Sequence, residues 1–203
     1  MSQAPTVDFS SIQLRAESTP NPATMKFCFS TTVIDRTLEF NSATEAENSP
    51  LASKIFGFPW ATSVLLAPNF IAITKQDWID WDYLTNPLTH LIQEHFQLNL
   101  PVLEELKMVD VGYADDSNSI LETDTELVKK LKQVLNREIR PMLAYDGGDV
   151  QYAALSAEGI LSLRFKGACS GCPSKSATLK GGIEVRIKEL FPEIISVTEF
   201  TGK

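Results

Sequence analysis

Two cysteines in the C-terminal part of the chain, Cys169 and Cys172, have the type and spacing that best suit chemistry. They lie in a C-x-x-C pattern, and the residues around them are small. Small residues let backbone N–H groups come close to sulfur, because no side chain intervenes. Such N–H groups stabilise anionic sulfides and tune the potential of an iron–sulfur cluster. The pattern therefore predicts a loop that binds a metal centre or carries out redox chemistry.

The residue after the pair is Pro173, which is favoured at the first position of a helix. Cys172 would then stand at the cap of that helix. The amino end of a helix carries a partial positive charge, which favours thiolate over thiol. We therefore expect both cysteines to be available as thiolates.

One chain supplies only half of the ligands that a cluster needs. A [4Fe–4S] or [2Fe–2S] cluster is usually held by four thiolates, and the chain has three cysteines. The third, Cys28, lies on a predicted strand far away in the sequence, where a buried apolar role is more usual. A symmetric homodimer would supply two plus two thiolates on its two-fold axis.

Two other kinds of site remain open for the same pair. A C-x-x-C at a helix start can act as a thiol–disulfide oxidoreductase, cycling between dithiol and disulfide. A structural zinc site would need four ligands. His90 and His95 are five positions apart, which is a poor spacing for one helix face, and surface or partly buried roles suit them better.

The N-terminal half predicts a mixture of strands and helices. Strands are expected over residues 25–29, 64–66 and 70–74, the last two joined by a turn at Pro68-Asn69. A short helix should begin at Ser49-Pro50 and end near Gly57. A second helix is indicated after Pro87 by apolar residues at helical spacing.

The C-terminal half predicts the order α-β-β-α-β. Thr123-x-x-Glu126 has the form of a capping box before an amphipathic stripe that runs to Ile139, with Pro141 at its end or at a late kink. Residues 146–149 predict a turn, and Glu158-Gly159 a second one between two strands. The cysteine loop follows, then a helix with Leu179, Ile183, Ile187 and Leu190 on one stripe, and a last strand over 194–200.

The charge differs between the two halves. Residues 1–119 carry a net charge of −9 and residues 120–203 a net charge of +1. An acidic half repels phosphate, and the other half has no basic run, so we expect no nucleic-acid partner. No apolar stretch is long enough to cross a membrane. The N-terminus does not resemble a signal or transit peptide, so a cytoplasmic location is expected.

These observations predict an α+β protein of two small domains. We expect a first domain over 11–106, a flexible linker over 107–122 that is rich in polar, turn-forming residues, and a second domain over 123–203.

Several separated motifs occur in order along both halves of the chain. In the C-terminal half they are Ile139-Arg140-Pro141, residues 146–150, 167–173 and 178–184, and Pro192-Glu193; in the N-terminal half they are residues 19–22, 25–27, 49–52 and 70–75. With these motifs the C-terminal half resembles the C-terminal domain of NifU-like (Nfu-type) iron–sulfur carrier proteins, and the N-terminal half resembles the Nfu N-terminal domain. Ala23 and the segment 57–61 depart from the family pattern, so no binding residue is transferred to the N-terminal domain.

The resemblance implies a protein that is not an enzyme. It implies a [4Fe–4S] cluster, with [2Fe–2S] as the alternative, bridged between two protomers by Cys169 and Cys172. It further implies apo iron–sulfur proteins as recipients and an upstream cluster-assembly scaffold as the source. Residues 146–149 are expected to form a turn rather than a ligand set. Gly181 and Gly182 lie inside a predicted helix, where close packing of helix on sheet would explain them.

Overall fold

The structure is a computed structural model, and it describes residues 13–104, 117–170 and 176–200, without the side chains of 176–180. The chain divides into two compact units, one built on a five-stranded sheet and one on a three-stranded sheet. This confirms the predicted α+β class with two domains. Most of the predicted linker, 107–122, lies outside the described residues. Each unit is considered by itself below.

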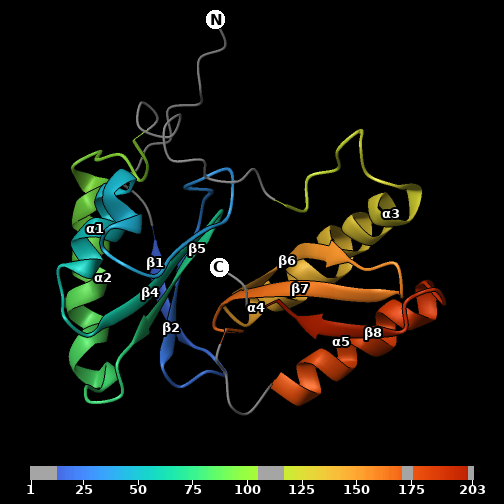
Figure 1. Cartoon of the computed structure of the whole chain (residues 1–203). Helices are drawn as coiled ribbons and strands as arrows, with labels where there is room; N and C mark the ends of the chain where they lie inside the picture. Colours follow the sequence, from blue (N-terminus) through green and yellow to red (C-terminus); the bar gives the residue numbers. More distant parts are fainter. Residues whose placement is uncertain (1–12, 105–116, 171–175, 201–203) are drawn as a thin grey trace, which may run out of the picture. The chain divides into compact units, whose positions relative to one another are not determined.

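In the N-terminal unit, two longer helices and a short 3₁₀ turn accompany a sheet of order β1-β2-β5-β4-β3 (Figure 1). The strands are β1 (Leu14–Ser18), β2 (Thr24–Phe29), β3 (Leu38–Phe40), β4 (Ala61–Ala67) and β5 (Phe70–Lys75); the helices are η2 (Glu45–Asn48), α1 (Pro50–Phe56) and α2 (Trp81–Gln97).

Local signals account for the shorter elements of this unit. The Ser49 hydroxyl accepts a hydrogen bond from the N–H of Ala52 at 3.2 Å, so α1 starts at Pro50 as predicted. Strands β4 and β5 pair antiparallel around the predicted turn, with Ala67 opposite Phe70. The largest fully buried side chains of this unit are Phe27, Phe40, Leu51, Ile55, Leu65, Leu66, Ile71, Ile73, Leu88, Ile92 and Phe96.

Helix α2 corrects one expectation, because it begins at Trp81 and contains Pro87 in its interior. A proline removes one backbone donor and was expected to precede the helix. The apolar stripe nevertheless extends back to Leu84, which is buried. In addition, the hydroxyl of Thr85 donates to the carbonyl of Trp81 at 2.7 Å, within the turn that precedes the proline. Burial of one further turn outweighs the local cost of the proline.

The C-terminal unit has the predicted order α-β-β-α-β. Its first helix is continuous through a π-helical turn, and the sheet order is β6-β7-β8, antiparallel between β6 and β7 and parallel between β7 and β8. The elements are α3 (Glu126–Val134), η4 (Leu135–Ile139), α4 (Arg140–Tyr145), β6 (Gly148–Leu155), β7 (Ile160–Gly167), α5 (Ser176–Leu190) and β8 (Ser196–Glu199).

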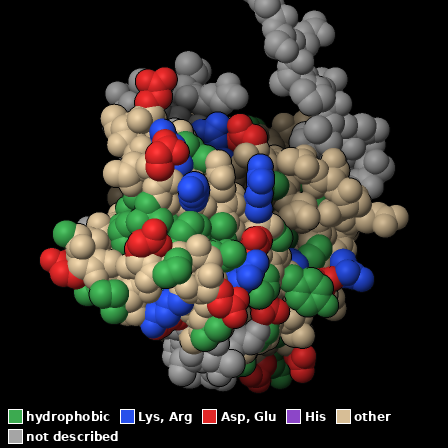
Figure 2. Space-filling view, turned by 90° about the vertical axis from the view of Figure 1, so that its right-hand side faces the viewer, with side chains coloured by type: hydrophobic (Ala, Val, Ile, Leu, Met, Phe, Trp, Pro, Cys, Tyr) green, Lys and Arg blue, Asp and Glu red, His purple; other side chains and the backbone are tan. Residues whose placement is uncertain are grey.

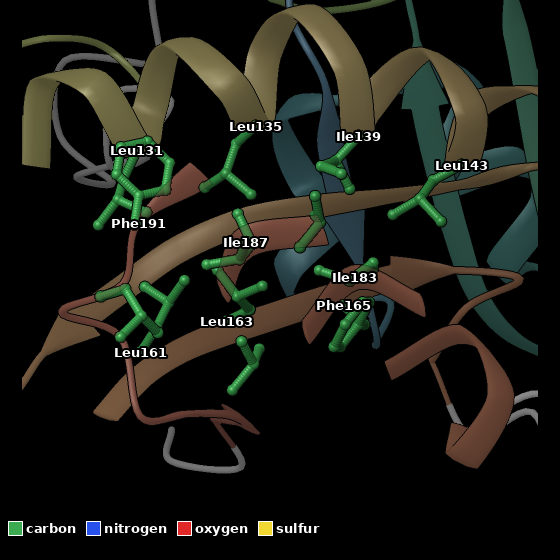
Figure 3. Packing of buried hydrophobic residues seen from close by; sticks show 13 residues of the cluster. Leu131, Leu135, Ile139, Leu143, Leu161, Leu163, Phe165, Ile183, Ile187 and Phe191 are labelled. Atoms are coloured by element: carbon green, nitrogen blue, oxygen red, sulfur yellow. The ribbon is translucent and has the colours of Figure 1, made fainter. Parts of the chain in front are cut away.

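The core of this unit lies between its helices and one face of the sheet. Leu161, Leu163 and Phe165 of β7 point toward the helices, as their alternation predicted (Figure 3). Ile183 and Ile187 of α5 pack into the same cluster, at most 1% exposed. Leu190 was expected on that stripe, but it is 39% exposed because it lies in the last turn of α5. The side chain of Leu179 lies outside the described residues.

The start of the first helix also differs from expectation. Thr125, not Thr123, caps α3, because its side chain accepts the N–H of Val128. The residue between them, Asp124, accepts the N–H of Leu121 at 2.8 Å and pairs with the buried Lys132. These contacts accompany a helix start two residues later than the capping box predicts. Of the two expectations for Pro141, the end of the helix is wrong, because α4 continues to Tyr145. An irregularity does lie near the proline, since a π-helical turn ends at Ile139, two residues before it.

The side chain of Asn118 covers part of the outer edge of β6. Its amide nitrogen donates to the carbonyl of Val150 at 2.8 Å, and its oxygen accepts the N–H of Tyr152 at 2.6 Å. The side chain thus pairs with β6 as a neighbouring strand would, and Asn118 is fully buried. Covering an edge in this way blocks pairing with another chain at that point.

On the face in Figure 2, basic and acidic side chains are interspersed without a large field of one sign. In the described ranges, none of the helices has the length and apolar character needed to cross a membrane.

Gly181 and Gly182 contradict the expectation of close helix–sheet packing. A β-carbon built on either glycine would meet nothing within 4 Å in the part of the chain that the structure describes. Both residues are exposed on α5. The glycines therefore meet no packing requirement within the described chain, and they weaken the helix.

Replacing either glycine by alanine should stabilise the C-terminal unit by about 1 kcal/mol, because alanine has the higher helix propensity and a less flexible unfolded chain. Hydrogen exchange of amides in β6 and β7, measured for Gly181→Ala and Gly182→Ala, would check this. Unchanged or faster exchange would contradict it.

His95 is fully buried in the N-terminal unit, at the end of α2. Its Nε2 lies 3.1 Å from the carbonyl oxygen of Pro101, and its Nδ1 has no hydrogen-bond partner among the described residues. Burial is the main cause that lowers the pKa of His95 below its ordinary value of 6.5. The folded unit therefore favours the neutral ring.

As the pH falls below 6.5, the unfolded chain should take up a proton before folded His95 does. The free energy of unfolding of the N-terminal unit should then decline until the folded-state pKa is reached, and be unaffected by this residue above 6.5. All three tryptophans lie in this half, so urea unfolding followed by tryptophan fluorescence reports on it. In His95→Gln the decline should be smaller; an identical pH profile would refute the assignment.

Candidate metal centre

Cys169 lies in the turn that follows β7, and its side chain is half-buried. Strand β7 ends at Gly167, whose φ of 60° is the left-handed conformation that glycine adopts readily. The N–H of Cys169 points to the carbonyl of Lys166 at 3.4 Å, and the N–H of Ser170 donates to Gly167 at 3.0 Å. Cys172 and Pro173, including the predicted helix start, lie outside the described residues.

The turn before β6 lies against the cysteine turn. Gly147 has a φ of 79°, and its carbonyl accepts the N–H of Ala168 at 3.1 Å. Gly148 pairs with Gly167 in the β6–β7 register. A β-carbon built on Gly148 would lie 2.3 Å from Sγ of Cys169 and 3.1 Å from its backbone nitrogen. Only a residue without a side chain leaves room for Cys169 at this place.

The carboxylate of Asp149 is engaged within the fold. It forms a two-bond ion pair with Arg140, and the side chain of Asp149 is 6% exposed. The predicted turn covers Asp146 and Gly147, whereas Gly148 and Asp149 already belong to strand β6. Sequence reasoning did not find that Gly148 touches Cys169, nor that Arg140 anchors the turn. The signal that could have found them is the recurrence of both in the motifs that carry the family resemblance.

Cys28 lies on β2 in the N-terminal unit and is half-buried. Its thiol donates a hydrogen bond to Oε2 of Glu17 at 3.3 Å. Burial, and then this bond, raise the pKa of Cys28 above its ordinary value. The thiol is therefore held protonated, which is the opposite of what a metal ligand needs.

Both histidines belong to the N-terminal unit, whereas the cysteine loop belongs to the C-terminal unit. His90 is exposed on α2, and His95 is buried against Pro101 in the same half of the chain. Among the described residues, no group of three or more His, Cys, Asp or Glu could hold a metal ion. Cys169 is the described cysteine of the C-terminal unit and can offer a thiolate ligand.

Comparison with known proteins places both halves in one family. Residues 12–99 match the family described as "Scaffold protein Nfu/NifU N terminal", and residues 131–198 match "NifU-like domain". The chain belongs to the Nfu/NifU family. This family comprises iron–sulfur cluster scaffold proteins rather than enzymes, and the NifU-like match includes both Cys169 and Cys172.

Curated relatives cover both domains of this Nfu-type chain. "NifU-like protein 5, mitochondrial" of Arabidopsis thaliana is 34% identical over 193 residues, which are 94% of this chain and 69% of that protein. "NFU1 iron-sulfur cluster scaffold homolog, mitochondrial" of Drosophila sechellia is 32% identical over 93% of this chain and 65% of its own length. A NifU-like protein of Schizosaccharomyces pombe is 33% identical over 93% of this chain and 73% of its own.

A solved structure gives a weaker match. The solution structure of a NifU-like protein from Saccharomyces cerevisiae overlaps with 52% of this Nfu-type chain and 93% of its own chain, at 19% identity and a TM-score of 0.42. This likeness is too low to bear on the site.

Gly148→Ala should displace the cysteine turn, because the added β-carbon collides with the sulfur of Cys169 and makes a tight contact of 3.1 Å with its backbone nitrogen. We expect a loss of about 1–3 kcal/mol in the stability of the C-terminal unit and a changed reaction rate of the Cys169 thiol with iodoacetamide. Gly181→Ala adds the same methyl group in open space of the same unit and is the matched control. Equal thiol reactivity in the two variants would contradict the contact.

Proposed function

We propose that this chain carries a [4Fe–4S] cluster between two copies of itself, bound by Cys169 and Cys172 of each copy, and transfers the cluster to apo iron–sulfur proteins. The observation that carries the proposal is the placement of Cys169 on a turn built from three glycines, Gly147, Gly148 and Gly167. This turn holds the cysteine by main-chain contacts. Membership of a scaffold family supports the cluster as cargo rather than as a catalytic group.

The need for a second copy follows from the number of thiols. Four thiolates usually hold a cluster, and the loop of one chain supplies two. Cys28 is a poor third ligand, since its thiol is half-buried, bound to Glu17 and has a raised pKa. A two-fold axis through the loop supplies the remaining two thiolates. A site shared in this way opens when the dimer dissociates, which suits release of the cargo.

The identity of the cluster rests on the family resemblance. Two pairs of thiolates could equally hold a [2Fe–2S] cluster, so the iron content per dimer separates the two. A thiol–disulfide oxidoreductase would use the same pair without iron, and a zinc module would hold a colourless ion. Both are outcomes that the experiment below distinguishes.

The partners and the compartment remain part of the proposal. Apo iron–sulfur proteins as recipients and an upstream assembly scaffold as the source fit a carrier. The acidic N-terminal half, with its net charge of −9, would favour partners with basic surfaces. The cytoplasmic location expected from the N-terminus stays a prediction, because relatives from Arabidopsis and Drosophila are named mitochondrial. Cell fractionation with an antibody against the chain would decide this.

Cys169→Ser and Cys172→Ser should each abolish cluster binding, because either change leaves a dimer with two thiolates in place of four. The measurement is iron and sulfide content together with native mass after anaerobic reconstitution. Wild-type protein should contain four iron and four sulfide per two chains if the cluster is [4Fe–4S]. Cys28→Ser is the matched control and should bind like wild type.

Three results would overturn the proposal. Wild-type-like cluster content in either loop variant would show that the loop is not the site. A cluster on a monomer would remove the shared arrangement. Zinc in protein purified without oxygen, or disulfide reductase activity without iron, would favour one of the two alternatives.

A further inference from the structure

Two ion pairs in the described part of the C-terminal unit are largely buried. In one, Arg140 donates from Nε to Oδ1 of Asp149 at 2.7 Å and from its NH2 nitrogen to Oδ2 at 2.9 Å. The side chains of Arg140 and Asp149 are 19% and 6% exposed. In the other, Nζ of Lys132 lies 2.8 Å from Oδ2 of Asp124, with side chains 4% and 12% exposed.

The first pair is joined to the cysteine turn through a short backbone path. Asp149 directly follows Gly148, the residue against which Cys169 lies. Asp149 is also opposite Lys166 in the β6–β7 register, and the carbonyl of Lys166 faces the N–H of Cys169 at 3.4 Å. A rotation of the Asp149 backbone therefore moves two residues that contact Cys169, namely Gly148 and Lys166.

Arg140 is well placed to resist such rotation. It lies on α4, whose Leu143 is buried in the core, and its NH1 nitrogen donates to the side-chain oxygen of Asn136 at 3.1 Å. A two-bond guanidinium–carboxylate pair fixes the plane of the carboxylate as well as its position. The ion pair thus connects the turn to helix α4, which is packed in the core. Pairing of β6 with β7 holds Gly148 less firmly, because Gly148 is the first residue of its strand.

The second pair has other neighbours. Lys132 also donates to the carbonyl of Ser119 at 2.9 Å and lies over the ring of Tyr152. These contacts join α3 to the segment before it and to β6 beyond the cysteine turn. The two pairs are alike in burial and charge but differ in whether they reach Cys169, so the second is a natural control for the first.

We infer that the Arg140–Asp149 ion pair is the positioning device of the cluster site, holding Gly147-Gly148 so that Cys169 keeps its place when the second copy and the cluster arrive. The part of this inference that concerns the cluster rests on the proposed function. The part that concerns the placement of the Cys169 thiol does not. Arg140 and Asp149 are positioning residues and not ligands. Groups that hydrogen-bond directly to a metal ligand typically change metal affinity about 10–100-fold when they are removed. The Arg140–Asp149 pair acts on Cys169 through the backbone of Gly148, so we expect an effect of about tenfold.

The first measurement requires no cluster. In a full-length Cys28→Ser, Cys172→Ser background, Cys169 is the single thiol, and its rate of alkylation by iodoacetamide reports on its placement. Adding Asp149→Asn or Arg140→Gln should change this rate several-fold, whereas Asp124→Asn or Lys132→Met should not. Arg140→Lys retains the charge but not the two-bond geometry, so it should rescue the rate only in part. Equal rates in the two sets of variants would overturn the inference.

The second measurement uses reconstituted protein with both loop cysteines present. Asp149→Asn and Arg140→Gln should lose iron to a ferrous chelator about tenfold faster than Asp124→Asn or Lys132→Met variants of matched apo-protein stability. If the rate of iron release depended only on apo-protein stability, in the same way for all four variants, the Arg140–Asp149 pair would have a merely structural role. If wild-type protein takes up no cluster, the proposed function fails, while the alkylation rates still decide whether the pair positions Cys169.

Discussion

The cysteine turn depends on the close approach of Cys169 to Gly148. The sulfur occupies the space that a β-carbon on residue 148 would fill. This approach requires that Gly148 be opposite Gly167, which is a matter of strand register. A slip of one residue that placed Asp149 opposite Gly167 would exchange the two faces of the strand and put a charged residue next to the cysteine. The site is therefore a consequence of the way in which β6 and β7 pair.

The register is in turn set by the apolar core. Val150 and Leu163 are fully buried on the face that the helices cover, and their alternation with polar residues leaves one favourable register. The helix from Glu126 to Tyr145 spans the unit through a π-helical turn and brings Leu143 close to the start of β6. Packing of large side chains far from the cysteine thus decides where a small turn lies.

A site that carries cargo needs a fixed backbone and a side that is accessible to other molecules. The backbone is fixed by main-chain hydrogen bonds and two left-handed glycines, Gly147 and Gly167, which define the turn without bulky side chains. The half-buried state of Cys169 leaves part of the residue exposed to other molecules. An arrangement of this kind suits cargo that must be bound and later released. The acidic N-terminal half, with its separate sheet, adds a surface of different charge.

The sequence by itself determined the element types, the order α-β-β-α-β, the two-domain α+β class and the family, because these depend on periodicity, turn residues and spaced motifs. Element ends were less predictable. The cap at Thr125 in place of Thr123 goes with the contacts of Asp124 to Leu121 and Lys132, and the helix around Pro87 goes with burial of Leu84. Only the tertiary structure decided that Gly148 lies against Cys169, that Arg140 holds Asp149, and that Gly181 and Gly182 face open space. The physical reason is that contacts such as those of Gly148 with Cys169 and of Arg140 with Asp149 depend on strand register and helix packing, which no local pattern encodes.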